Sequence, residues 1–117
     1  MKILIVDDQP LARKIVRTVL GTGMHEVWEA GGAAEAIAMY GQFLPDVVLM
    51  DISLGEMDGI EATRRIRASD SHAKIIMITI ADDARSRAES FRAGASGFFL
   101  KDDLTRLPEV LEELRDK

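Results

Sequence analysis

The sequence predicts an α/β fold in which a parallel sheet of five strands is covered by helices on both faces. Three segments, 3–6, 47–50 and 75–78, are unbroken runs of four apolar residues, and such short runs are typical of strands buried on both faces. Amphipathic segments with helical spacing lie between the strands. Because strands and helices alternate strictly, helical crossovers and parallel strands are favoured. We therefore expect one doubly wound (βα)5 domain over residues 1–117.

The composition fits an ordinary globular domain. Of the 117 residues, 47% are hydrophobic and 30% are charged, which suits one core. The absence of cysteine excludes disulfides and thiolate metal sites. The net charge of −5 argues against a nucleic-acid surface and is compatible with cation binding. No apolar run approaches the about 20 residues of a membrane span, and the first strand begins beside Met1, so we expect a cytoplasmic protein without membrane contact.

The first half of the chain reads as strand, helix, strand, helix. The strand 2–6 leads to Pro10, which suits a helix's first turn, and Asp8 is a candidate cap for that helix. Segment 25–29 mixes polar and apolar residues, which indicates an edge strand, and a helix is expected over 33–43. The side chains expected to face inward from the two helices are Leu11, Ala12, Ile15, Val16, Val19 and Leu20, then Ala33, Ile37, Tyr40 and Leu44.

The second half continues this alternation from the strand 47–51. A helix is expected at about 58–68, a strand over 75–79, a weakly apolar helix over 84–92 and a last strand over 97–100, followed by a final helix. The residues expected to face inward are Gly59, Ala62, Thr63 and Ile66 on the first of these helices, Ala84, Ala88 and Phe91 on the second, and Leu107, Val110, Leu111 and Leu114 on the third.

The strand order is expected to be 2-1-3-4-5, the flavodoxin-like order, because the first, third and fourth strands are fully apolar and the second is not. In such a sheet the crossovers reverse direction between strands 1 and 3, and ligands bind at the carboxyl edge there. Five polar side chains follow or end strands at this edge although they are far apart in sequence. They are Asp7, Asp8, Asp51, Thr79 and Lys101.

This group of side chains indicates metal and phosphoryl chemistry. Three carboxylates at close range repel one another, so a proton or a cation must join them, and Lys101 offsets only one charge. Mg²⁺ prefers oxygen ligands and often binds phosphoryl groups. Asp51 could then attack phosphorus as a carboxylate nucleophile, and Thr79 and Lys101 could bind the phosphoryl oxygens.

The same residues, with two neighbouring motifs, resemble a known family along the whole chain. The motifs are Asp7-Asp8 after the first strand, Asp51 after the third, Met57-Asp58-Gly59 at the next helix, Thr79 after the fourth strand, and Gly94-Ala95-Ser96-Gly97-Phe98 leading to Lys101. In this order they resemble the receiver domain of bacterial two-component response regulators. The short Leu100-Lys101-Asp102 segment resembles receivers of the LuxR/NarL type, which precede a helix-turn-helix effector.

The resemblance implies a signalling switch and no conventional enzyme activity. Asp51 would accept a phosphoryl group from a sensor histidine kinase or a phosphotransfer protein. Asp8, Asp51 and the backbone carbonyl of Ser53 would ligate Mg²⁺, with Asp7 acting through water. Thr79 and Phe98 would be the pair that moves on activation. The face formed by the 84–92 helix, the last strand and the final helix would then act on a partner or effector domain.

Four departures from the family pattern bear on these expectations. Asp102 stands where proline often follows the lysine, so a trans peptide is expected there. Gly55 stands in place of a frequent proline, and Phe98 replaces a common tyrosine and lacks its hydroxyl. Ile80 stands where a small residue is usual, and its stiff β-branched side chain is expected to restrict access to Asp51.

Two other functions remain open on the sequence. One is a degenerate receiver that docks partners without phosphorylation, with Ile80 and Asp102 as its support. The other is an enzyme on a similar sheet. A flavodoxin would need a Ser/Thr/Gly phosphate loop in place of Asp7-Asp8-Gln9-Pro10, and a haloacid-dehalogenase-type phosphatase would carry Asp-x-Asp after its first strand.

Overall fold

Five parallel strands form one sheet with the order β2-β1-β3-β4-β5, as predicted. The computed structural model describes all residues except 56, 81, 116 and 117. The strands are β1 (Lys2–Val6), β2 (Glu26–Ala30), β3 (Val47–Asp51), β4 (Ile75–Thr79) and β5 (Gly97–Leu100). The helices are α1 (Pro10–Leu20), α2 (Ala33–Phe43), α3 (Gly59–Ser69), α4 (Ala84–Arg92) and α5 (Leu107–Arg115), and a 3-10 helix, η1 (Lys101–Arg106), precedes α5.

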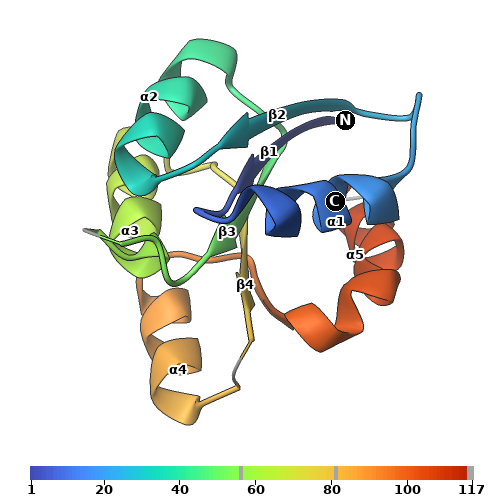
Figure 1. The fold of residues 1–117 in the computed structure, drawn as a ribbon. Helices are drawn as coiled ribbons and strands as arrows, with labels where there is room; N and C mark the ends of the chain where they lie inside the picture. Colours follow the sequence, from blue (N-terminus) through green and yellow to red (C-terminus); the bar gives the residue numbers. More distant parts are fainter. Residues whose placement is uncertain (56, 81, 116–117) are drawn as a thin grey trace.

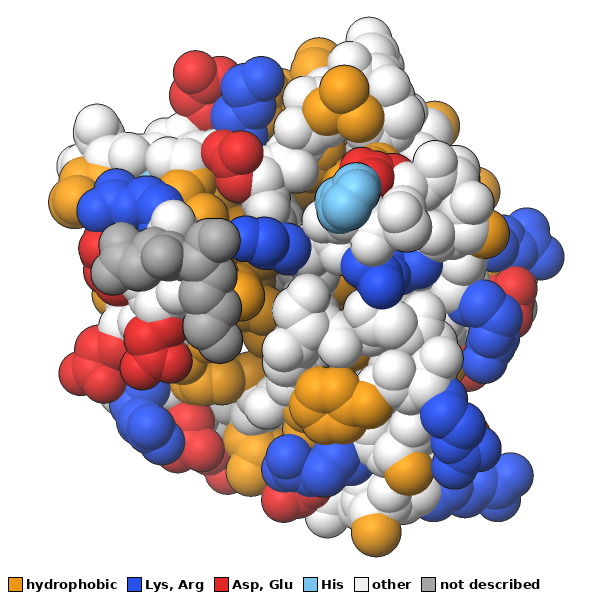
Figure 2. Space-filling view, turned by 180° about the vertical axis from the view of Figure 1, so that it is seen from behind, with side chains coloured by type: hydrophobic (Ala, Val, Ile, Leu, Met, Phe, Trp, Pro, Cys, Tyr) orange, Lys and Arg blue, Asp and Glu red, His pale blue; other side chains and the backbone are white. Residues whose placement is uncertain are grey.

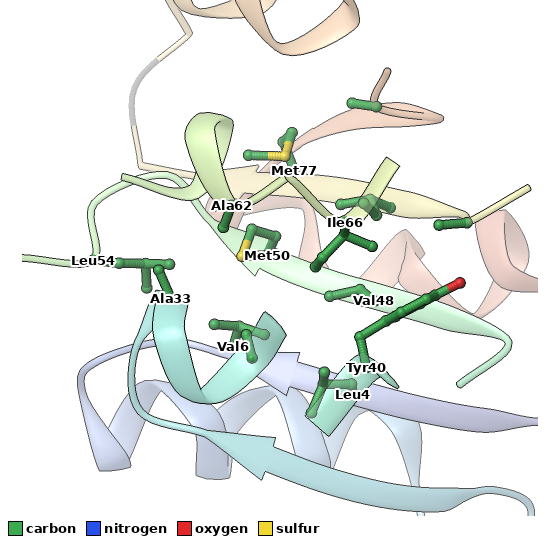
Figure 3. Close-up of a cluster of buried hydrophobic side chains, with 14 of the residues drawn as sticks. Leu4, Val6, Ala33, Tyr40, Val48, Met50, Leu54, Ala62, Ile66 and Met77 are labelled. Carbon is green, nitrogen blue, oxygen red and sulfur yellow. The ribbon is translucent and has the colours of Figure 1, made fainter. Parts of the chain in front are cut away.

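The helices cover both faces of the sheet, which explains why its central strands are apolar without interruption. Figure 1 shows α1 and α5 on one face and α2, α3 and α4 on the other. Side chains alternate between the two faces along a strand, so in β1 Leu4 and Val6 join the core beneath α2 and α3, while Ile3 and Ile5 join the core beneath α1 and α5. Figure 3 shows the first of these cores, with Leu4 and Val6 of β1 and Val48 and Met50 of β3.

The start of α3 lies against the end of β3. The N–H of Gly59 donates to the carbonyl of Ile52 at 2.7 Å, and the Asp58 carboxylate caps the helix by accepting from the N–H of Glu61 at 2.8 Å. A Cβ on Gly59 would fall on the backbone carbonyl oxygen of Asp51. Glycine is therefore required at this position for α3 to approach the strand that carries Asp51.

Two expectations for α1 were wrong. Leu11 is 68% exposed and Ile15 is also exposed, although both were expected to face the core. The apolar stripe of α1 is wider than the side that meets the sheet, so Val16 and Leu20 are buried and the residues at the stripe's edge are not. Asp8 does not cap α1, because Gln9 occupies the cap position and no side chain caps the helix there.

The inward residues of α2 and α4 were also partly misassigned. Leu44 follows the end of α2 with a left-handed backbone, φ 47°, and this turns its side chain to the surface. In α4, Ala84, Ala88 and Phe91 are exposed, and the buried residue is Ser90. The apolar residues of α4 lie beside the face that packs, so this helix buries little apolar surface.

The basic run Arg64, Arg65 and Arg67 has two structural roles. Arg64 and Arg65 are exposed and pair with Glu61 one turn earlier in α3, so this part of α3 is a solvated face. Arg67 donates to the backbone carbonyls of Ser71 and Ala73 and so fixes the turn that leads into β4. Figure 2 shows basic side chains gathered on the side of the molecule where α3 and α4 lie. No helix in the described part of the chain is long and apolar enough to cross a membrane.

Candidate metal and phosphoryl site

Three carboxylates meet where β1 and β3 end. Asp7 directly follows β1, Asp8 comes next, and Asp51 is the last residue of β3. One oxygen from each lies within 4.8 Å of the other two. Asp7 is 3% exposed and Asp51 is 8% exposed, whereas Asp8 is open to solvent. Parallel neighbouring strands end at the same edge, so the sheet itself brings the three acids together.

Asp7 is held by hydrogen bonds at its backbone N–H and at both of its carboxylate oxygens. Its N–H donates to the carbonyl of Ala30 at the end of β2, at 3.2 Å. Its Oδ1 accepts from the N–H of Gln9 at 2.9 Å, and its Oδ2 accepts from Lys101 Nζ at 2.9 Å. Both carboxylate oxygens of Asp7 therefore already accept hydrogen bonds from the protein.

Lys101 joins two of the three acids. It follows β5, and its Nζ lies 3.8 Å from Asp51 Oδ2 as well as 2.9 Å from Asp7. The ammonium group is therefore already beside the Asp51 carboxylate. Three carboxylates and one ammonium leave a formal surplus of two negative charges if all four groups are ionised, which a divalent cation would balance.

The environment of Asp51 opposes its charge in the absence of a cation. Burial and the nearby Asp7 charge raise the pKa of Asp51 to about 6, against the opposing effects of Lys101 and a backbone hydrogen bond from Ser53. A cation that joined the carboxylates would favour the ionised form. Carboxylate oxygens at this spacing fit Mg²⁺, which takes oxygen ligands and keeps several waters. The exposed Ser53, two residues after Asp51, lies in the loop expected to supply a backbone carbonyl.

Thr79, another predicted site residue, lies at the same edge of the sheet. Thr79 ends β4 and is nearly buried, and Ile80 directly after it is 80% exposed. The Ile80 side chain therefore points to solvent and not into the sheet. No cis peptide bond occurs among the described residues, so the Lys101–Asp102 bond is trans, as expected.

Phe98 has an unexpected neighbour. It lies half-buried in β5, and the guanidinium carbon of Arg87 in α4 is 4.6 Å from the centroid of its ring. Arg87 also pairs with Asp82 at 3.2 Å. Cation–π contacts of this kind contribute about 0.5–1 kcal/mol at exposed sites. The sequence contained no signal for this contact, because residues 87 and 98 meet only through the packing of α4 on β5.

These features define a single α/β domain with an acidic, cation-compatible site at the carboxyl edge of its sheet. A family profile described as "Response regulator receiver domain" matches residues 3–112. The chain therefore belongs to the receiver domains of two-component response regulators. The structure is also similar to a crystal structure of a LuxR-family two-component response regulator from Aurantimonas sp. SI85-9A1, with a TM-score of 0.92 and 36% identity over 99% of this chain and 86% of that one.

Curated relatives include both single receivers and longer regulators. The chemotaxis protein CheY of Halobacterium salinarum is 35% identical over 98% of this chain and 94% of its own length. The uncharacterized transcriptional regulatory protein YxjL of Bacillus subtilis is 37% identical over 98% of this chain, but this chain spans only 53% of YxjL. These similarities establish that the chain is a receiver domain, but they do not identify the process that it controls.

Proposed function

We propose that Asp51 accepts a phosphoryl group in a Mg²⁺-dependent reaction and that residues 1–117 form one receiver domain. The observation that carries the proposal is the meeting of Asp7, Asp8 and Asp51 at one edge of the sheet, with Lys101 between two of them. A cation that balanced the surplus negative charge would also bind the oxygens of a phosphoryl group beside the nucleophilic carboxylate.

The proposed ligands divide between direct and water-mediated contacts. Asp8, Asp51 and the backbone carbonyl of Ser53 would hold Mg²⁺ directly, and Asp7 would act through water because both its oxygens already accept from Gln9 and Lys101. When bound, Mg²⁺ would neutralise carboxylate charge and orient the phosphoryl oxygens.

In the transfer, an Asp51 oxygen attacks the phosphorus of the donor. A new O–P bond forms as the bond from phosphorus to the donor atom breaks, and the electron pair of that bond leaves with the donor. Thr79 and Lys101 bind the phosphoryl oxygens. The distance of 3.8 Å between Lys101 Nζ and Asp51 Oδ2 supports this role.

Phosphorylation changes the charge at position 51 from about −1 to nearly −2, and the Thr79 hydroxyl and the Phe98 ring move in response. Two charge-assisted hydrogen bonds contribute roughly 3–6 kcal/mol together, compared with the roughly 5.5 kcal/mol that moves a population from 1:99 to 99:1. We therefore expect some active-like population before phosphorylation and an incomplete shift after it. The sparsely buried α4 is the element that moves most readily.

The proposed partners follow from the family and from the moving face. The phosphoryl donor is a sensor histidine kinase or a phosphotransfer protein in the cytoplasm. The α4-β5-α5 face transmits the change to a partner or to an effector domain of the LuxR type, and this segment makes no direct contact with nucleic acid or membrane.

The test is intact-mass analysis after treatment with acetyl phosphate, with and without Mg²⁺. We expect one phosphoryl group per chain with Mg²⁺, little without it, and none on Asp51→Asn under either condition. A wild-type chain that gains no phosphoryl group with Mg²⁺, although a known receiver treated alongside does, would instead favour the degenerate docking receiver.

A further inference from the structure

Arg13 ties three elements together just outside the acidic site. It lies in the first half of α1, and its side chain is only 18% exposed. Its Nη1 donates to the backbone carbonyl of Asp7 at 2.6 Å, and its Nε donates to Glu29 Oε1 in β2 at 3.0 Å. One side chain thus connects α1, the end of β1 and the edge strand.

The Asp7 carbonyl belongs to the peptide unit that joins Asp7 to Asp8. This unit is planar, so a bond to its oxygen fixes the direction in which the chain enters Asp8. The Asp7 N–H is held on its other side by the carbonyl of Ala30. The Asp8 carboxylate is exposed, and no other described residue hydrogen-bonds to it. Among the described residues, this carboxylate is therefore constrained only through its own backbone.

We propose that Arg13 is a positioning residue for the metal site, which orients Asp8 by holding the Asp7–Asp8 peptide. This inference rests on the proposed function, since it assumes that Asp8 is a ligand. Glu29 orients Arg13 in turn. Its Oε1 accepts from Arg13 Nε, while Arg13 Nη1 donates to the Asp7 carbonyl.

The direction in which Mg²⁺ affinity changes when Arg13 is replaced distinguishes a positioning role from a purely electrostatic one. Removing a positive group near a cation site would strengthen cation binding through Coulomb's law. Loss of an orienting hydrogen bond would weaken binding, and partners of ligands commonly change metal affinity by about tenfold or more. Weaker Mg²⁺ binding in a variant that lacks the Arg13 charge is therefore a signature of positioning.

Arg17 provides a matched control. It pairs with the same Glu29, at 2.8 Å from Oε2, and donates to the carbonyl of Val27, but it makes no hydrogen bond to Asp7. Arg13→Gln and Arg17→Gln each remove one positive charge and one partner of Glu29, and only the first removes the bond to the Asp7 carbonyl. Arg13→Lys keeps the charge with a single ammonium group, which lacks the forked geometry that joins Glu29 and Asp7.

The experiment is a calorimetric Mg²⁺ titration of the full chain and these three variants, together with amide spectra by NMR in the absence of metal. We expect the Mg²⁺ dissociation constant to rise about tenfold in Arg13→Gln, by a smaller factor in Arg13→Lys, and to stay unchanged or fall in Arg17→Gln. The metal-free amide signals of Asp8 and Gln9 should shift in both Arg13 variants and remain in place in Arg17→Gln.

Two results would overturn the inference. One is Mg²⁺ binding by Arg13→Gln that equals or exceeds that of the wild type, and the other is equal weakening by Arg17→Gln. If Arg13→Gln does not fold, Arg13→Lys still decides, since unchanged affinity and unchanged Asp8 signals would reject positioning. A wild-type chain that binds no Mg²⁺ would instead contradict the proposed function, and the metal-free spectra would still report whether Arg13 holds the Asp7–Asp8 peptide.

Discussion

Replacing Gly59 with alanine tests whether the close approach of α3 to β3 sets the position of Asp51. The new Cβ would overlap the Asp51 carbonyl oxygen and lie 2.9 Å from Met50 Cγ. Neither neighbour can move easily, because one is strand backbone and the other is fully buried. Overpacking of this kind typically costs about 1–3 kcal/mol, and we expect Gly59→Ala to lie near 3 kcal/mol because the clash involves backbone.

Gly41→Ala is the matched control. Gly41 lies in α2, is exposed, and has no atom within 4 Å of its added Cβ. Alanine stabilises the middle of a helix relative to glycine by about 0.5–1 kcal/mol, so this variant should be more stable than the wild type. The same chemical change is thus expected to have opposite signs at the two positions, with a difference of about 4 kcal/mol.

Urea unfolding measures both variants directly. The midpoint should fall for Gly59→Ala and rise for Gly41→Ala, with similar slopes. Gly59→Ala should also accept phosphoryl from acetyl phosphate more slowly, since Asp51 must shift to relieve the clash. A Gly59→Ala protein as stable as the wild type would show that α3 is not closely packed against the end of β3, and the reasoning about this contact would fail.

Four further predictions concern the site and α4. Because the pKa of Asp51 is raised to about 6, its neutral form stabilises the metal-free fold fully below about pH 4, and this contribution is lost as the pH rises through 6. Asp51→Asn should therefore be more stable than the wild type at pH 7 without Mg²⁺, by at most about 3 kcal/mol. Equal stability of the two proteins in urea would contradict this. Lys101→Ala should still accept phosphoryl but fail to shift its output face, so amide shifts of α4 that match phosphorylated wild type would refute its role. Ile80→Ala should raise the rates of both phosphorylation and dephosphorylation severalfold if the exposed side chain shields the in-line path to phosphorus. If neither rate changes, Ile80 does not shield Asp51. Ser90 Oγ is buried without a hydrogen-bond partner among the described residues, so Ser90→Ala should stabilise the fold by about 1 kcal/mol in thermal unfolding, whereas a lower midpoint would indicate an unseen partner for the hydroxyl.

The sequence predicted the sheet, and the edge of the sheet at which the acids meet, for the same physical reason. Strands buried on both faces are continuous apolar runs, and the carboxyl ends of parallel strands lie at one edge, so the sequence predicts that Asp51 and Thr79 share that edge. The burial of α1 and α4 was harder to predict, because an apolar stripe does not define how far a helix is rotated. Leu11 and Phe91 are exposed for this reason.

Contacts between elements could not be predicted from spacing. Arg13 reaches the Asp7 carbonyl through the packing of α1 beside β1, and Arg87 reaches Phe98 through the packing of α4 beside β5. The sequence signals of both arginines were those of ordinary surface residues on amphipathic helices. These contacts depend on how the helices pack, whereas the meeting of the acids at the strand ends depends only on the strand order of the sheet.

The central claim is tested most directly by locating the phosphoryl group. After treatment with acetyl phosphate and Mg²⁺, reduction with borohydride converts an aspartyl phosphate to homoserine, which peptide mass mapping can assign to one residue. We predict homoserine at position 51 alone, its loss when Mg²⁺ is removed, and its absence from Asp51→Asn. Homoserine at position 7 or 8 in the wild type, or equal modification of Asp51 without Mg²⁺, would contradict the proposed acceptor and its dependence on the metal.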